Sequence, residues 1–157
     1  MNDLEQFSLL LADVGPNYDD VQQIDVVSED TWAVFFSDQA AVEIHYDTIG
    51  HAVSFTMPIG QVSNENREQQ YELMLSFNFL KRDTGGFHLA IDGENGDAWL
   101  MLDIHRTDVD GDALIGILDT ILDAGTSWRR ILSGELPADS DELSLGGVGM
   151  AAGAIRV

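Results

Sequence analysis

Residues 41–58 read AVEIHYDTIGHAVSFTMP, and this stretch decides the class of fold. Apolar and polar side chains alternate over residues 42–47 and again over residues 52–57, with the turn-forming run Thr48-Ile49-Gly50 between them. Because successive side chains of a strand point to opposite faces, a period of two indicates a strand with one apolar face. The stretch therefore predicts two antiparallel strands of a sheet that is buried on one side.

Towards the N-terminus the sheet is expected to continue. Residues 21–27 and 31–36 are rich in β-branched and aromatic side chains and are followed by turn-forming residues, which is typical of strands. Together with residues 41–58 they predict a meander of three or four antiparallel strands. Pro58 and Gly60 are expected to end it.

The start of the chain predicts a helix. Its apolar residues recur at spacings of three, four and three, and they are Leu4, Phe7, Leu11 and Val14. Asn2 or Asp3 can cap the first turn, and Gly15-Pro16 is expected to stop the helix.

Beyond the meander the pattern changes to helix, hairpin and helix. A helix is predicted from about Asn64 to Leu80, with acidic residues near its start and Lys81-Arg82 at its end, as the helix dipole favours. Residues 87–91 and 98–104 predict a hairpin around an acidic, glycine-containing turn. Apolar residues at helical spacing then predict a third helix over residues 110–132.

These elements define the predicted fold class as α+β. An antiparallel twisted sheet is combined with three helices, in the order helix, three or four strands, helix, two strands, helix. Residues 1–133 are expected to form a single domain, which suits a chain of 17.2 kDa. Residues 134–157 are rich in Gly and Ala, and we expect them to be a flexible tail.

The chain is strongly acidic. It has 7 Lys and Arg against 28 Asp and Glu, a formal net charge of −21 and a pI near 4.1, and its first basic residue is Arg67. Because nucleic acids and anionic lipids attract clustered Lys and Arg, neither nucleic acid nor a membrane is expected as a partner. The sequence shows no transmembrane run, no secretory signal and no cysteine, so we expect a soluble protein of the reducing cytoplasm.

No pattern of catalytic or metal-binding residues stands out. The chain lacks a nucleophile elbow and a phosphate-binding P-loop, and its four histidines are not at zinc-ligand spacings. The acidic runs at residues 92–97 and 108–112 lack the oxygen set of an EF-hand loop, and a hairpin turn and a helix start explain them better. We therefore expect no enzyme, no catalytic residue, no metal and no cofactor.

Three apolar stretches follow one another in the second half of the chain. They are YELMLSFNFL at residues 71–80, TGGFHLAID at residues 84–92 and AWLML at residues 98–102. A leucine-rich helix ending near an Asn, a glycine-rich turn with a short strand, and an apolar return strand in this order resemble the Tir-chaperone (CesT-like) family of type III secretion chaperones. The third helix, with Trp128 near its end, resembles the closing helix of that family, so the resemblance covers about residues 3–132.

The resemblance implies a small cytoplasmic homodimer that binds the N-terminal region of one secreted effector protein without ATP. Such a chaperone keeps an extended effector segment soluble and competent for type III secretion. The first part of this chain combines bulky apolar residues with no Lys or Arg, which favours an apolar groove for such a segment. The predicted effector-binding residues are Leu4, Phe7, Leu11, Phe35, Val42 and Ile44.

The predicted helix over residues 64–80 is apolar over more than one face. Such a helix needs cover on two sides, such as its own sheet and a second subunit. We therefore place a homodimer interface on this helix and on the hairpin. The predicted interface residues are Tyr71, Met74, Leu75, Phe79, Trp99 and Met101.

Two other functions stay open at this point. An acidic inhibitor or regulator could bind a basic protein by charge, and its affinity would then fall steeply with ionic strength. An enzyme of unrecognised type would need a pocket in which a histidine and a carboxylate have perturbed pKa values.

Overall fold

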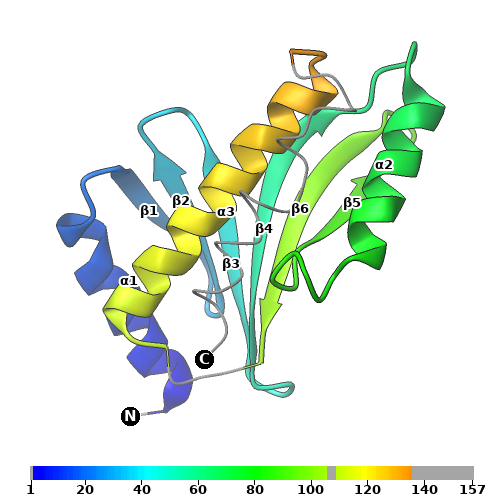
Figure 1. The fold of residues 1–157 in the computed structure, drawn as a ribbon. Coiled ribbons are helices and arrows are strands. Elements are labelled where there is room, and N and C mark those ends of the chain that lie inside the picture. The colour runs from blue at the N-terminus through cyan, green and yellow to red at the C-terminus, as the bar shows by residue number, and fades with distance from the viewer. Residues whose placement is uncertain (1, 106–108, 136–157) are drawn as a thin grey trace. The chain divides into compact units, whose positions relative to one another are not determined.

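The computed structural model describes residues 2–105 and 109–135, and in them the chain forms three helices and a six-stranded antiparallel sheet (Figure 1). The strand order is β1-β2-β3-β4-β6-β5. The elements are α1 (Asp3–Asn17), β1 (Val21–Ser28), β2 (Thr31–Phe36), β3 (Ala41–Asp47), β4 (Ala52–Gln61), α2 (Arg67–Phe79), β5 (His88–Asp92), β6 (Asp97–Ile104) and α3 (Gly111–Leu132). The predicted α+β class is confirmed, with four strands in the meander. Of the predicted tail, residues 136–157 lie outside the described residues.

The chain divides into two compact units. One comprises Met1–Met57 and Asp103–Asp119, and the other comprises Pro58–Leu102 and Thr120–Val157. The divisions fall inside β4, β6 and α3, so neither unit is a simple segment of the sequence. That residues 1–133 act as one domain stays a prediction.

Helix α1 begins with a reciprocal cap. The side-chain oxygen of Asn2 accepts a hydrogen bond from the Glu5 N–H at 2.8 Å, and the Glu5 carboxylate accepts one from the Asn2 N–H at 3.0 Å. The predicted stop at Gly15-Pro16 is wrong, because α1 continues to Asn17. Pro16 lies in the last turn, and the Asn17 side-chain amide donates to the Asp13 carbonyl at 2.8 Å, which satisfies one terminal carbonyl.

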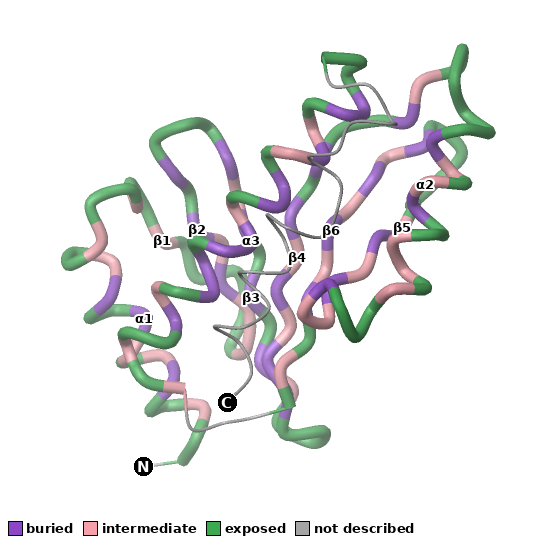
Figure 2. The backbone as a smooth tube through the Cα atoms, in the orientation of Figure 1, coloured by how far each residue is buried: buried purple, intermediate pink, exposed green. Residues whose placement is uncertain are grey.

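The core of the first unit lies where α1 packs on the apolar face of the sheet, which Figure 2 shows as buried segments of β2 and β3. The ring of Phe7 lies 5.6 Å from the ring of Trp32 and 5.4 Å from that of Tyr46. Val34 and Val42 are opposite each other on β2 and β3, and neither has any exposed surface. The apolar residues of the alternating pattern therefore lie on the inner, buried face of these strands.

The prediction that Pro58 and Gly60 end the meander is wrong, because β4 runs through both to Gln61. The pairing of β4 with β3 ends at Thr56, so the N–H that Pro58 lacks is not part of the ladder with β3. Pro58 is exposed, and its carbonyl accepts a hydrogen bond from the Arg129 guanidinium at 3.3 Å.

The second unit is built around α2, α3 and the β5–β6 hairpin. Helix α2 begins at Arg67 instead of Asn64, because the preceding turn is held by Gln70. This buried amide accepts from the Ser63 N–H at 2.7 Å and donates to the Leu132 carbonyl at 3.2 Å. Asn78 pairs with both backbone groups of Leu89 on β5, at 2.7 and 2.9 Å. These two amides fix α2 in register with its neighbours in this unit.

Helix α3 matches the prediction closely. The Asp110 carboxylate accepts from the Ala113 N–H at 2.8 Å and caps the first turn. Near the other end, the ring of Trp128 is almost fully buried and meets the ring of Phe77 edge-on at 5.2 Å. Arg129 and Arg130 then lie in the last turn, where the helix dipole favours cations.

Candidate functional site

Strand β1 is an open edge of the sheet. It pairs only with β2, and no other strand in residues 2–105 or 109–135 pairs with it. Six of its eight residues are exposed, among them Val26 at 73% and Val27 at 60%. An exposed edge carries unpaired backbone N–H and C=O groups and is a template for a further strand.

Two irregularities limit where a further strand can pair. The register of β1 with β2 shifts between Val21 and Gln23 and again between Val26 and Ser28. Such bulges twist an edge strand and interrupt its ladder. Between them, residues 23–26 keep a regular register, so the usable edge is about four residues long.

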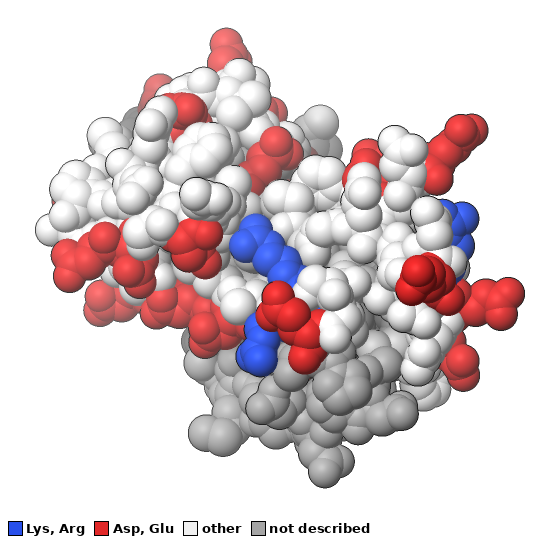
Figure 3. Space-filling model, turned by 90° about the horizontal axis from the view of Figure 1, so that it is seen from above, with Lys and Arg blue, Asp and Glu red and all other residues white. Residues whose placement is uncertain are grey.

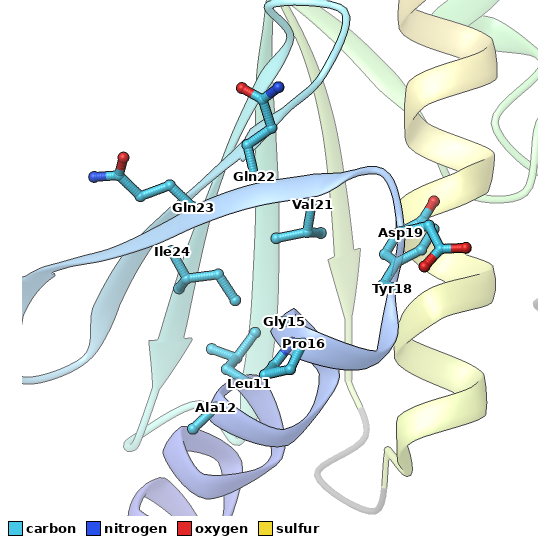
Figure 4. A pocket seen from close by; sticks show the side chains of 10 residues that line it. All are labelled: Leu11, Ala12, Gly15, Pro16, Tyr18, Asp19, Val21, Gln22, Gln23 and Ile24. Atoms are coloured by element: carbon cyan, nitrogen blue, oxygen red, sulfur yellow. The ribbon is translucent and has the colours of Figure 1, made fainter.

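A hollow of about 590 Å³ lies between the end of α1 and the start of β1 (Figure 4). Ile24 points from β1 towards Leu11 on α1, whereas Gln22 and Gln23 point away from the helix. Gly15 lets the two elements approach, since a Cβ at this position would lie 3.0 Å from Cδ1 of Ile24. The lining residues are Leu11, Ala12, Gly15, Pro16, Tyr18, Asp19, Val21, Gln22, Gln23 and Ile24.

The surroundings of this hollow are acidic. The unit that contains it, residues 1–57 and 103–119, has sixteen Asp and Glu and one basic residue, Arg106, which lies outside the described residues. Asp19 lines the hollow itself, and the hydroxyl of the neighbouring Tyr18 donates to the Asp119 carboxylate. Figure 3 shows how far carboxylates outnumber cations on one face of the molecule. The field here attracts cations.

The structure separates the six predicted effector-binding residues. Phe7, Leu11, Val42 and Ile44 are at most 4% exposed and belong to the core, because they face the interior between α1 and the sheet. Leu4 is half-buried, while Phe35 is 39% exposed on the other face of β2. Of the six, only Leu11 lines the hollow. The six side chains therefore do not form one open groove in this structure.

The residues that sequence reasoning missed are on β1. Val21 and Ile24 line the hollow and Val26 is the most exposed apolar residue of the strand. Their apolar character was visible in the sequence, but their exposure follows from β1 having no neighbour on one side. A signal that could have found them is the poor alternation of residues 21–28 compared with residues 41–47.

The predicted dimer residues fall into three groups. Met74 is buried, at 3% exposure. Tyr71, Trp99 and Met101 are half-buried. Leu75 and Phe79 are 68% and 89% exposed and line a second hollow, of about 420 Å³, on the outer face of α2.

Titratable groups with shifted pKa values are found in turns and in the core. Hydrogen bonds from Ser28 and Thr31 lower the pKa of Asp30, and hydrogen bonds from the N–H groups of Gly50 and Ile49 lower that of Asp47. Burial raises the pKa of Tyr46. In the described part of the chain no three His, Asp or Glu side chains are placed to hold a metal ion. None of its helices is long and apolar enough to span a membrane.

Several solved structures have the same fold. The chain matches a protein in the crystal structure of the ExsC-ExsE complex with a TM-score of 0.69 at 17% identity, over 84% of this chain and 97% of that one. It matches a protein in the HopA1-SchA chaperone-effector complex with a TM-score of 0.63 at 15% identity, over 81% and 95%. The heterodimeric ExoU-SpcU complex from the type III secretion system of Pseudomonas aeruginosa gives 0.55 at 15% identity, over 72% and 91%.

Sequence comparison gives the family directly. No protein with a curated description is similar enough to match this chain. Residues 21–129, which run from the start of β1 into the last turns of α3, match the Tir chaperone protein (CesT) family. This match spans more than half of the chain and confirms the predicted resemblance. The chain therefore belongs to the Tir chaperone protein (CesT) family of type III secretion chaperones.

Proposed function

We propose that this protein is a cytoplasmic chaperone that binds the N-terminal region of a secreted effector and keeps it soluble and competent for type III secretion, without ATP. The observation that carries the proposal is the open edge of β1 beside the hollow at the end of α1, whose lining includes Leu11, Val21 and Ile24, in a member of this chaperone family. An edge strand binds an extended chain through backbone hydrogen bonds, and a neighbouring hollow can take one of its side chains.

The mode of binding follows from the groups at the edge. An effector segment would add as a strand along residues 23–26, and every second side chain would lie on the α1 side, near Ile24. Because backbone hydrogen bonds supply much of the affinity, the segment must be held unfolded while it is bound. This explains how a chaperone could work without ATP, since binding alone prevents the segment from folding or aggregating.

We also propose that the protein is a homodimer. The outer face of α2 supports a homodimer, because Leu75 and Phe79 are large and apolar and yet largely exposed there. On the hairpin, Trp99 and Met101 are half-buried, so part of each side chain is open to a second copy. A second copy that covered α2 and the hairpin would bury the apolar side chains.

Co-purification from the native cell, followed by mass spectrometry of whatever travels with the protein, would identify the effector. Binding of its N-terminal fragment should then be measured for Val26→Asp, which places a charge on the exposed edge without entering the core. We expect a loss of about tenfold or more in affinity, as for a central interface residue. Ile49→Asp is the matched control, because Ile49 is 90% exposed in a turn of the same unit. Equal affinity for both variants would reject the β1 edge as the binding site.

One observation favours a second candidate. The net charge of −21 suits an inhibitor or regulator that binds a basic protein by charge alone. Raising the salt from about 50 to about 500 mM would separate the two functions, because the Debye length shrinks several-fold over that range. Charge-driven binding would then be largely lost, whereas strand addition would keep most of its affinity.

A further inference from the structure

We infer that the segment added to β1 alternates apolar and basic residues, with a Lys or Arg directly opposite Asp25 and apolar residues on either side of it. The inference rests on the proposed function and specifies the chemistry of the partner at the same site. It follows from the register of β1, from the faces that its residues occupy and from the charge around them.

The register assigns a face to each residue of the usable edge. It pairs residues of β1 with residues of β2 as follows: Gln23 with Phe35, Ile24 with Val34, Asp25 with Ala33 and Val26 with Trp32. Val34 and Trp32 are buried, so Ile24 and Val26 are on the same face as the core and α1. Gln23 and Asp25 are therefore on the opposite face, because successive residues alternate.

A strand paired with β1 would continue both faces. The two side chains next to Ile24 and Val26 would lie on the α1 face, where Val26 is 73% exposed and the hollow is lined by Leu11 and Ile24. Apolar side chains fit there because they remove this surface from water. The side chain between them would lie on the other face, directly opposite Asp25.

Asp25 forms no ion pair within the described residues. It is exposed, its carboxylate accepts one hydrogen bond from the Gln23 amide at 2.6 Å, and residues 1–66 contain no Lys or Arg. Opposite charges that face each other across neighbouring strands stabilise the pair, and like charges destabilise it. A Lys or Arg at the facing position of the partner strand supplies the missing cation, and an acidic residue there would be disfavoured.

The test uses short synthetic peptides and the full-length protein. The probe is an acetylated and amidated peptide of sequence Ser-Thr-Leu-Lys-Leu-Thr-Ser, with twins that have Gln or Glu in place of Lys. A fourth peptide, Ser-Thr-Lys-Leu-Leu-Thr-Ser, has the same composition without the alternation. Each is titrated at about 50 mM and about 300 mM salt, so that long-range attraction is screened in the second series. Binding is followed by the NMR shifts of backbone amides 22–27.

We expect the Lys peptide to bind about three- to tenfold more tightly than the Glu peptide, and the Gln peptide to have an affinity between the two. The non-alternating peptide should bind more weakly than the alternating Lys peptide. In Asp25→Lys the order of the Lys and Glu peptides should reverse. In Asp13→Lys it should persist, because Asp13 gives the same change of charge on an exposed position of α1 that does not line the hollow.

The outcomes separate this inference from the proposed function. If all four peptides shift amides 22–27 with equal affinity, or if Asp25→Lys keeps the original order, strand addition stands and the alternating chemistry is overturned. If no peptide shifts these amides even at millimolar concentration, strand addition at β1 fails, and the inference fails with it.

Discussion

The two units of this chain both leave apolar surface exposed, but on different kinds of structure. In residues 1–57 and 103–119 the exposed apolar surface includes the edge strand β1, where Val26 and Val27 are neighbours in sequence and both largely exposed. In the other unit it includes the helix α2, where Leu75 and Phe79 are largely exposed. An edge strand has free backbone groups, whereas the backbone groups within a helix are already paired. The strand therefore suits an unfolded segment, and the helix suits a surface that is already folded, such as a second copy.

The two units also differ in net charge. The unit with the edge strand has sixteen acidic residues and one basic residue, and the other has twelve acidic and six basic residues. Their formal charges are therefore −15 and −6. Two copies of the chain that associate through the unit with α2, of charge −6, repel each other less than two copies that associate through the unit with β1, of charge −15. The contrast supports effector binding at β1 and self-association through α2. Variants in one unit should then affect one of these two functions and leave the other unchanged.

The largest effect is expected in the core of the first unit. Val42→Asp places a charge where the side chain has no exposed surface, which should lower the free energy of unfolding by about 3–5 kcal/mol or prevent folding. Circular dichroism with urea titration would measure the loss. Glu43→Ala, at the next position on the exposed face of β3, is the control and should change stability by less than about 0.5 kcal/mol. A stable, folded Val42→Asp variant would mean that this position is groove surface after all.

The second largest effect concerns the exposed face of α2. Phe79→Asp should weaken self-association by about 2 kcal/mol or more without unfolding the protein, because the side chain is 89% exposed in the isolated chain. Sedimentation at micromolar concentration should give about twice 17.2 kDa for the wild type and a lower mass for the variant. Gln69→Asp makes a similar change of charge elsewhere on α2 and should keep the wild-type mass. A monomeric wild type would remove the proposed homodimer.

The sequence predicted which residues share a face of a strand or helix, but not which of these faces are exposed. The alternation in residues 41–57 correctly predicted that Val42 and Ile44 are on the same face of the sheet. The alternation could not show that this face is buried in the core, where neither side chain has any exposed surface. Composition could not show that β1 is the edge, because strand order depends on contacts between residues far apart in the chain. On α2 the apolar circumference indicated that two sides need cover, but only the fold decides that Met74 faces inwards while Phe79 faces out.

A moderate effect is expected where α1 meets β1. In Gly15→Ala the new methyl group would lie 3.0 Å from Cδ1 of Ile24, so Ile24 must move into the hollow beside it. We expect binding of the effector fragment to weaken about two- to fivefold, while stability changes by less than about 1 kcal/mol because alanine also favours the helix. Gly116→Ala on α3 is the control, since its methyl group would meet nothing within 4 Å. Unchanged binding by a folded Gly15→Ala variant would count against the hollow as part of the site.

The smallest effect is expected in the turn between β3 and β4, which belongs to neither proposed surface. The Asp47 carboxylate accepts hydrogen bonds from the N–H groups of Ile49 and Gly50 at 2.9 and 2.8 Å, and these bonds lower its pKa from 3.8. A carboxyl whose pKa is lower in the folded state stabilises the fold above its unfolded pKa, and this contribution is lost as the pH falls through the folded value. Asp47→Ala should therefore lower the urea midpoint slightly at pH 7 and hardly at all near about pH 2, whereas the neighbouring Thr48→Ala should show no such dependence on pH. Effector binding by Asp47→Ala should be unaffected at pH 7, because the turn is not part of the β1 edge. If Asp47→Ala lowered the urea midpoint equally at both pH values, the charge of this carboxylate would not be what stabilises the turn.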